Sequence, residues 1–186
     1  MNRIKSITTN KVCCPVAIGL SLLLALVGCT ESPTGEAKPV VNWQERATRI
    51  PEDSLQAGAT YLSVYSQIYS QSEHRTFNLT VTVSLRNTNT ADTVYIQSVD
   101  YYDTSGEAIR KYIRQPVFIA PMETVEIVIA EDDLQGGTGG NFYFDWLTPA
   151  GSQPPYFEAV MISTYGSQGL SFSTQGHPVG TPRKHP

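Results

Sequence analysis

Cysteine is scarce in this chain, and its placement excludes whole classes of site. The three cysteines, Cys13, Cys14 and Cys29, all lie within the first 29 residues. The rest of the chain can therefore form no internal disulfide, and it contains no Cys-x-x-Cys pair for zinc binding or redox chemistry. The stability of any folded domain beyond Cys29 must come from an ordinary hydrophobic core.

Catalytic motifs are missing as well. The sequence has no G-x-S-x-G elbow, no H-E-x-x-H pair and no P-loop. Its three histidines are His74, in a polar stretch, and His177 and His185, near the end of the chain. None of them stands beside a marked nucleophile, so we expect a protein that is not an enzyme and uses no cofactor. A hydrolase with paired carboxylates in its loops is the remaining enzymatic alternative.

Positive charge is in short supply. The chain has 13 Lys and Arg residues against 17 Asp and Glu residues, which gives a net charge of −4. Residues 1–28 contain three of the basic residues and none of the acidic ones, so their removal would change the net charge from −4 to −7. An acidic protein without clustered Lys and Arg is not expected to bind nucleic acid.

The longest apolar run lies close to the start. Residues 1–11 are basic without an acid, residues 12–27 are almost wholly apolar, and Leu26–Cys29 matches the bacterial lipobox [LV]-x-[AG]-C. The run is shorter than the ~20 residues that a membrane-spanning helix needs. This order of regions is typical of a cleaved secretory signal peptide.

Cys29 is the predicted lipidation site. Its thiol would accept diacylglycerol, and cleavage before it would free an amine for a further acyl chain, so that several chains anchor the protein to a membrane. Thr30 is not the aspartate that typically retains lipoproteins in the inner membrane. We therefore expect a lipoprotein of the outer membrane that faces the periplasm, with the inner membrane and the cell surface as alternatives.

Composition divides the chain into four parts. Residues 1–28 form the lipoprotein signal peptide, and residues 29–58 are polar, contain Pro and Gly, and are predicted to be a flexible tether. Residues 59–175 form the folded domain. Residues 176–186 lack apolar periodicity and are predicted to be a disordered tail.

Apolar and polar residues alternate throughout the predicted domain. Alternation with a period of two predicts strands at residues 77–85, 125–129 and 142–146. Residues 157–163 are apolar on both parities, which predicts a central strand covered on both faces. About seven strands without an amphipathic helix indicate an all-β antiparallel β-sandwich. We expect an immunoglobulin-like topology, with a small barrel as the alternative.

One irregularity interrupts this pattern. Val94 and Ile96 occupy one parity, whereas Val99 and Tyr101 occupy the other. A change of parity inside a strand predicts a β-bulge near Gln97 and Ser98.

An acidic cluster followed by a glycine-rich stretch is a candidate ligand loop. Asp132, Asp133 and Asn141 offer oxygen atoms of the kind that Ca²⁺ prefers, but the stretch lacks the spacing of an EF-hand loop. The favoured interpretation is a connection between two strands in which glycine supplies positive φ angles. A calcium or small-ligand site is the alternative.

Two further groups of residues suggest surfaces for binding. Tyr61, Tyr65 and Tyr69 recur every four residues, and on one strand their rings would form a row able to stack on sugars or on a partner protein. Arg110, together with Lys111 and Arg114, forms a basic cluster that suits an anionic partner or protects the edge of a sheet from pairing.

Several ordered motifs resemble the bacterial lipoprotein family catalogued as domain of unknown function 3124. They fall between Tyr61 and Ser173: Val64–Tyr69, Arg75–Thr80 with Leu85–Thr88, Val99–Asp103, Ala120–Pro121, Gly136–Phe142 and Glu158–Met161. The resemblance implies a lipobox leader, in agreement with the interpretation of Cys29. It implies no activity, because the family has none assigned.

Together these observations predict a lipid-anchored envelope protein that acts as a non-catalytic binding or scaffolding module. Its expected partners are the membrane, through acylated Cys29, and an envelope protein or a glycan. A carbohydrate-binding or calcium-binding periplasmic domain is the alternative.

Overall fold

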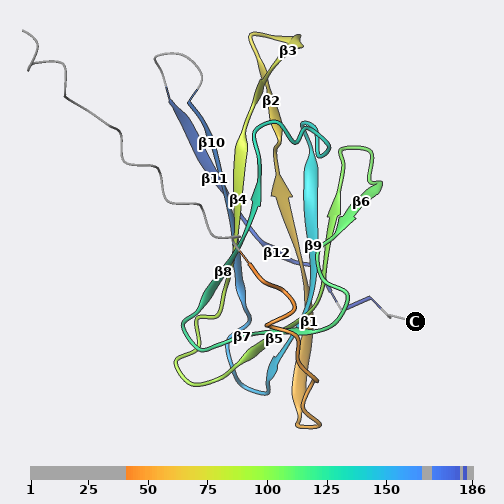
Figure 1. Cartoon of the computed structure of the whole chain (residues 1–186), viewed down its shortest axis with the longest axis vertical. Coiled ribbons are helices and arrows are strands. Elements are labelled where there is room, and N and C mark those ends of the chain that lie inside the picture. The colour runs from red at the N-terminus through yellow and green to blue at the C-terminus, as the bar shows by residue number, and fades with distance from the viewer. Residues whose placement is uncertain (1–40, 165–168, 181, 184–186) are drawn as a thin grey trace, which may run out of the picture. The chain divides into compact units, whose positions relative to one another are not determined.

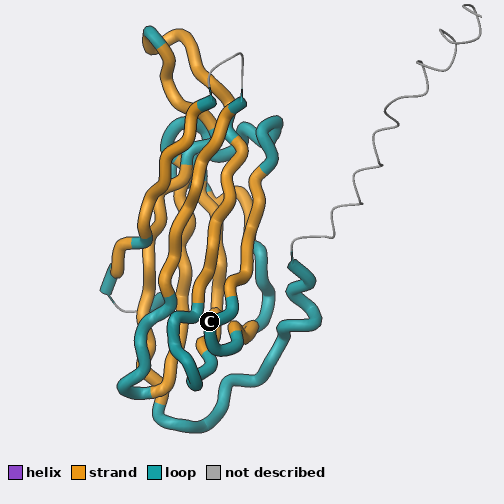
Figure 2. Tube along the Cα trace, turned by 90° about the vertical axis from the view of Figure 1, so that its left-hand side faces the viewer, coloured by secondary structure: helices purple, strands orange, loops and turns teal. Residues whose placement is uncertain are grey.

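Alternating apolar residues build two antiparallel sheets that enclose one core. The structure, a computed structural model, describes residues 41–164, 169–180 and 182–183. The predicted signal peptide, Cys29 and the first part of the predicted tether therefore lie outside the described residues. No helix occurs in the described part, and consequently none that is long and apolar enough to span a membrane (Figure 2).

The larger sheet, here called the major sheet, has β9 and β5 at its centre (Figure 1). Its order is β12 (His177–Pro178), β1 (Leu55–Val64), β9 (Gly140–Pro149), β5 (Val94–Tyr102) and β6 (Ala108–Lys111), and β7 (Val117–Ile119) also pairs with β5. The minor sheet has the order β11 (Leu170–Gln175), β10 (Tyr156–Ser163), β4 (Thr80–Arg86) and β8 (Thr124–Ile129). A separate hairpin pairs β2 (Gln67–Ser70) with β3 (Ser72–Asn78).

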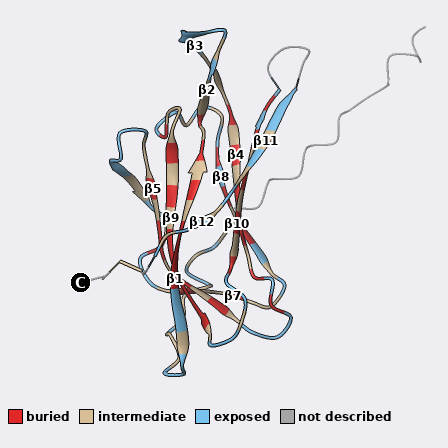
Figure 3. Cartoon of the chain, turned by 180° about the vertical axis from the view of Figure 1, so that it is seen from behind, coloured by how far each residue is buried: buried red, intermediate tan, exposed pale blue. Residues whose placement is uncertain are grey.

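Stacked aromatic rings join the two sheets. Phe144 of β9 and Phe157 of β10 have ring centroids 4.2 Å apart, and Phe142 stacks on Tyr101 at 4.6 Å. Buried residues run along the strands of both sheets, whereas exposed residues lie on the β2–β3 hairpin, on β11 and near the start of β1 (Figure 3). The prediction of an all-β antiparallel sandwich is therefore confirmed.

The number and order of the strands differ from the prediction. The described residues form twelve strands instead of the expected seven, partly because the strand predicted at residues 77–85 is divided at Leu79, whose backbone N–H donates to the Ser66 carbonyl. The pairs β4–β8 and β5–β9 match the central strands of an immunoglobulin domain, but the outer strands are exchanged. In the immunoglobulin order the first strand shares the sheet of the second strand, whereas here β1 pairs with β9, and β10 pairs with β4.

The central position predicted for residues 157–163 is confirmed, because β10 lies between β4 and β11. The prediction that this strand is covered on both faces is wrong. The side chain of Ile162 is 42% exposed, so its apolar character does not report burial. Apolar residues on a solvated sheet face are ordinary because β-branched side chains favour strands.

The predicted boundaries of the domain change at both ends. At the start, β1 begins at Leu55, and Ala47 forms a bridge with Val117 while Arg46 pairs with Glu123 at 2.6 Å. Residues 41–58 therefore lie against the domain rather than in a tether. At the end, β12 pairs with β1, so the described part of the predicted disordered tail is held on the major sheet.

Buried asparagines join the loops at one end of the sandwich. The Asn87 amide donates to the carbonyls of Asp92 and Ile119, and Asn89 exchanges hydrogen bonds with the backbone of Gln153. Because buried backbone groups need partners, these two side chains order three loops at once.

Gly58 offers a direct test of the packing. A Cβ atom at this position would overlap the ring of Trp146, whose indole N–H is fixed by a 3.0 Å hydrogen bond to Thr60 Oγ1. We predict that Gly58→Ala lowers the free energy of unfolding by about 1–3 kcal/mol, since overpacking forces neighbouring groups to shift. Urea denaturation followed by tryptophan fluorescence measures the effect.

Gly169→Ala is the matched control, because the nearest atom to its added Cβ would be 4.0 Å away. Equal stability of the two variants would contradict the packing of Trp146 on Gly58.

Candidate functional site

A β-bulge in β5 lies at the start of a polar site on the domain. In the pairing of β5 with β9 the register shifts between Ile96 and Ser98, so that Gln97 and Ser98 face the single residue Asp145. This confirms the bulge that the change of parity predicts. Beyond it, Ser98, Asp100 and Tyr102 point away from the core, while Val99 and Tyr101 are buried within it.

Asp145 lies at the centre of this site on the outer face of the major sheet. It is fully buried, and its Oδ2 atom accepts a 2.6 Å hydrogen bond from Ser98 Oγ. A buried carboxylate is costly unless it is paired and hydrogen-bonded. A cation above this position offsets that cost.

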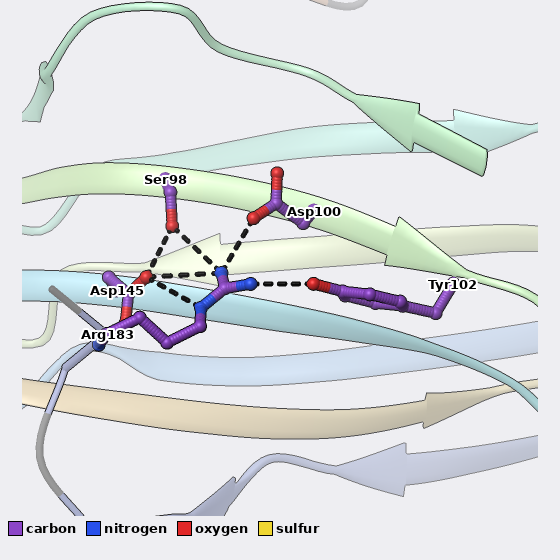
Figure 4. A network of polar contacts seen from close by, with 5 residues as sticks. All are labelled: Ser98, Asp100, Tyr102, Asp145 and Arg183. Atoms are coloured by element: carbon purple, nitrogen blue, oxygen red, sulfur yellow. Dashed lines mark hydrogen bonds and ion pairs between the residues drawn. The ribbon is translucent and has the colours of Figure 1, made fainter. Parts of the chain in front are cut away.

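Arg183 supplies that cation from the C-terminal segment (Figure 4). Its Nε and Nη2 atoms donate to Asp145 Oδ2 at 3.3 and 3.2 Å, and its backbone N–H donates to Asp145 Oδ1 at 3.2 Å. Nη2 also donates to Asp100 Oδ2 at 2.6 Å and to Ser98 Oγ at 3.3 Å, and Nη1 donates to Tyr102 Oη at 2.6 Å. One planar group thus meets four side chains.

An aromatic ring completes the arrangement. The Arg183 guanidinium carbon lies 4.2 Å from the ring centroid of Tyr143, within the range of a cation–π interaction. We call Ser98, Asp100, Tyr102, Tyr143 and Asp145 the outer-face site. Burial acts to lower the pKa of Arg183, but the Asp100 hydrogen bond and the charges of both carboxylates outweigh it and raise the pKa.

The chemistry of this arrangement suits the binding of a cation. Both carboxylates accept from the guanidinium, and the Ser98 hydroxyl donates to a carboxylate that is itself paired with the guanidinium. A guanidinium stays protonated in proteins, so Arg183 cannot accept a proton from Ser98. The site is built to hold a flat, positively charged group.

A second polar network lies at the glycine-rich loop. Arg110 donates to Asp133 at 2.8 Å, to Gln135 at 2.9 Å and to the Tyr112 hydroxyl at 3.0 Å, and its guanidinium lies over the ring of Tyr112. Burial raises the pKa of both Tyr101 and Tyr112. Arg110, from the predicted basic cluster, is thus already paired within the domain, whereas Lys111 and Arg114 are exposed.

The glycines of this loop serve close packing. A Cβ at Gly136 would overlap the Tyr101 hydroxyl, and Gly137 has a φ of 65°. Thr104 Oγ1 donates to the Gly136 carbonyl and accepts from the Gly139 N–H. These contacts support the interpretation of the stretch as a structural connection.

The three residues of the predicted calcium loop are placed differently from one another. Asp133 is bonded to Arg110, Asp132 is exposed, and Asn141 lies on β9 in register with Ser63 and Tyr102. Among the described residues, no three His, Cys, Asp or Glu side chains are grouped so as to hold a metal ion.

The tyrosines predicted as a row do not form one exposed strip. Tyr61 is half-buried on β1, and Tyr65 lies after β1 with its ring 5.8 Å from that of Phe172 in the minor sheet. Only Tyr69, on the hairpin, is well exposed, at 62%. The spacing of four residues misleads because the strand breaks between Val64 and Gln67.

Sequence reasoning missed the outer-face site. Asp145 interrupts the apolar run Phe142, Phe144 and Trp146 at an outward position, where a charged residue is unremarkable in a half-buried strand. Arg183 falls in the segment predicted to be a tail. The bulge was the one available signal, because bulges are enriched beside functional sites.

Comparisons with known proteins place the chain in a family. Residues 57–179 match the model of the family described as protein of unknown function DUF3124. The chain belongs to this family. This confirms the resemblance seen in the motifs, and the match covers β1 to β12 apart from the first two residues of β1.

The other comparisons add little to DUF3124 membership. No curated protein matches the chain. Among solved structures it is similar to the "Crystal Structure of Thermotoga maritima 1070", with 10% identity and a TM-score of 0.43, over 64% of this chain and 92% of that chain.

The structural and the calcium-binding interpretations of the glycine-rich loop predict different effects of substitution. If Asp133 serves Arg110, Asp133→Asn lowers the melting temperature by about 1–2 °C, as expected for losing a half-exposed ion pair. Asp132→Asn, the matched control, leaves it unchanged, and EDTA has no effect on any of the three proteins. A lower melting temperature with EDTA, abolished by either substitution, would instead establish a calcium site.

Proposed function

We propose that this DUF3124 protein is a lipid-anchored, non-catalytic binding module of the bacterial envelope. Acylation of Cys29 holds it to the outer membrane, facing the periplasm, and the domain presents the outer face of the major sheet to a partner. The lipobox leader supports the anchor and its location. The outer-face site supports the binding role.

The observation that carries the proposal is a preformed polar site on rigid elements. Its five side chains come from β5 and β9, which are neighbours at the centre of the major sheet. Sites built on paired strands keep their geometry better than sites built on loops. Two acids, two phenols and a hydroxyl converge here on one small area of the surface.

The non-catalytic role rests on how these groups satisfy one another. Asp100 and Asp145 share one guanidinium, and Ser98 donates to Asp145. A hydrolase that uses paired carboxylates needs one carboxyl group that donates a proton and another that acts on water or substrate. Carboxylates that are both engaged by a permanent cation are suited to binding instead.

A glycan is the second candidate ligand. Tyr61 and Tyr143 face each other in register across β1 and β9, and both rings are partly exposed. Neighbouring tyrosines on a sheet can stack on sugars. This pair replaces the predicted row of Tyr61, Tyr65 and Tyr69 as the aromatic surface.

A cross-linking pull-down from native envelopes tests the proposal. We expect the wild type to capture a specific envelope protein, Tyr143→Ala to lose it, and Cys29→Ser, which is not acylated, to capture much less. Tyr69→Ala is the matched control, because its ring is exposed on the distant β2–β3 hairpin.

Capture that survives Tyr143→Ala but not Tyr69→Ala would move the binding surface to the hairpin and contradict the proposal. Recovery of the same glycan by the wild type and Cys29→Ser, lost in Tyr143→Ala, would keep the surface and change the class of ligand.

A further inference from the structure

The Arg183 guanidinium is held in the manner of a bound ligand. Asp100 and Tyr102 each accept from it at 2.6 Å, Asp145 and Ser98 accept at 3.2–3.3 Å, and Tyr143 covers its face at 4.2 Å. Bidentate and stacked contacts of this kind select guanidinium over ammonium, because lysine offers a compact point charge rather than a flat fork.

The outer-face site, which acts as the receptor, and Arg183, which occupies it, belong to very different parts of the fold. The acceptors lie on β5 and β9, which pair along most of their length. Arg183 follows β12, a strand of two residues at the edge of the major sheet, whose backbone is fixed mainly by pairing with Thr60 and Tyr61 and by the Val179 N–H to the Ala59 carbonyl. The occupant can therefore leave with little change to the receptor.

The contacts also describe the ligand that the site would accept. Asp145 Oδ1 accepts from the backbone N–H of Arg183 while Oδ2 accepts from its side chain. One carboxylate thus reads both the amide and the guanidinium of a single residue. A free guanidinium would satisfy only half of this pattern, whereas an arginine within a peptide satisfies all of it.

We infer that the outer-face site recognises an arginine in a peptide segment of the partner, and that Arg183 is an internal ligand which this segment displaces. The inference rests on the proposed function, since it names the ligand of the same surface. It makes the C-terminal segment an autoinhibitory contact: the site is filled until an external arginine competes for it.

The magnitude of the competition follows from the covalent link. A tethered ligand competes at an effective concentration of about millimolar. The gain on removing the Arg183 side chain is one plus the ratio of this concentration to the dissociation constant of the site for an arginine segment. A dissociation constant of about 0.1 mM or tighter gives a gain of at least about tenfold, since the competent, empty state then becomes the major one.

Fluorescence anisotropy with short labelled peptides tests the inference on the full chain in detergent. The probes are fluorescein-Gly-Arg-Gly-amide, the same peptide with lysine, and the same peptide with citrulline, which is the neutral isostere of arginine. The proteins are the wild type, Arg183→Ala, Arg183→Ala with Asp145→Asn, and Arg114→Ala as the control, because Arg114 is exposed outside the site.

We expect Arg183→Ala to bind the arginine probe at least about tenfold more tightly than the wild type does. The lysine probe should bind more weakly, the citrulline probe should not bind, and Asp145→Asn should abolish the gain. Arg114→Ala should behave as the wild type. If Arg183→Ala fails to fold, Arg183→Gln keeps the stem of the side chain and serves in its place.

Two outcomes would overturn the inference. If Arg183→Ala melts at a lower temperature yet binds the arginine probe no better than the wild type, Arg183 only fastens the C-terminal segment. If all three probes bind equally, the site does not read a guanidinium. Either result leaves the proposed function standing as long as envelope capture still depends on Tyr143, so the two failures are distinguishable.

Discussion

The buried carboxylate of Asp145 imposes requirements on two distant parts of the chain. It accepts from Ser98, which the bulge in β5 turns toward it, and from Arg183, which lies 38 residues further along the chain. A carboxylate without these partners could not be buried at this depth without a large loss of solvation. The bulge that turns Ser98 toward Asp145 and the docking of the C-terminal segment therefore serve the same carboxylate.

This arrangement separates stability from recognition. The core between the sheets is held by the stacked rings of Phe142, Phe144 and Phe157. The β5 residues in register with Phe142 and Phe144 are Tyr101 and Val99, which do not belong to the outer-face site. The outer face carries the charges. The proposed function uses this separation, because an exchange of one cation for another above Asp145 would leave the core intact.

Local patterns in the sequence predicted much of the fold. Alternation of apolar residues located β4, β5, β8 and β9, an apolar run on both parities located β10, and the change of parity at Gln97 located the bulge, because these patterns depend on neighbours along one strand. The prediction that the glycine-rich stretch connects two strands is confirmed, but its packing on Tyr101 does not follow from the sequence.

Features that depend on residues far apart in sequence could not be predicted. The exchange of the outer strands depends on which strands β1 and β10 pair with, and no local pattern in the sequence encodes that choice. The outer-face site requires Ser98, Asp145 and Arg183 to meet, and the register that brings them together appears only in the folded sheet. The prediction of a tyrosine row is wrong for the opposite reason, since it extends a local spacing across a break in the strand.

The side-chain NMR spectrum of Arg183 in the full chain tests the central claim most directly. A guanidinium 4.2 Å from the Tyr143 ring centroid and bonded to two carboxylates should give resolved, slowly exchanging Hε and Hη signals shifted upfield by the ring. Tyr143→Leu should remove the upfield shift. Arg183 signals at the averaged position of free arginine, unchanged by Tyr143→Leu, would show that the outer-face site holds no guanidinium and would contradict the account.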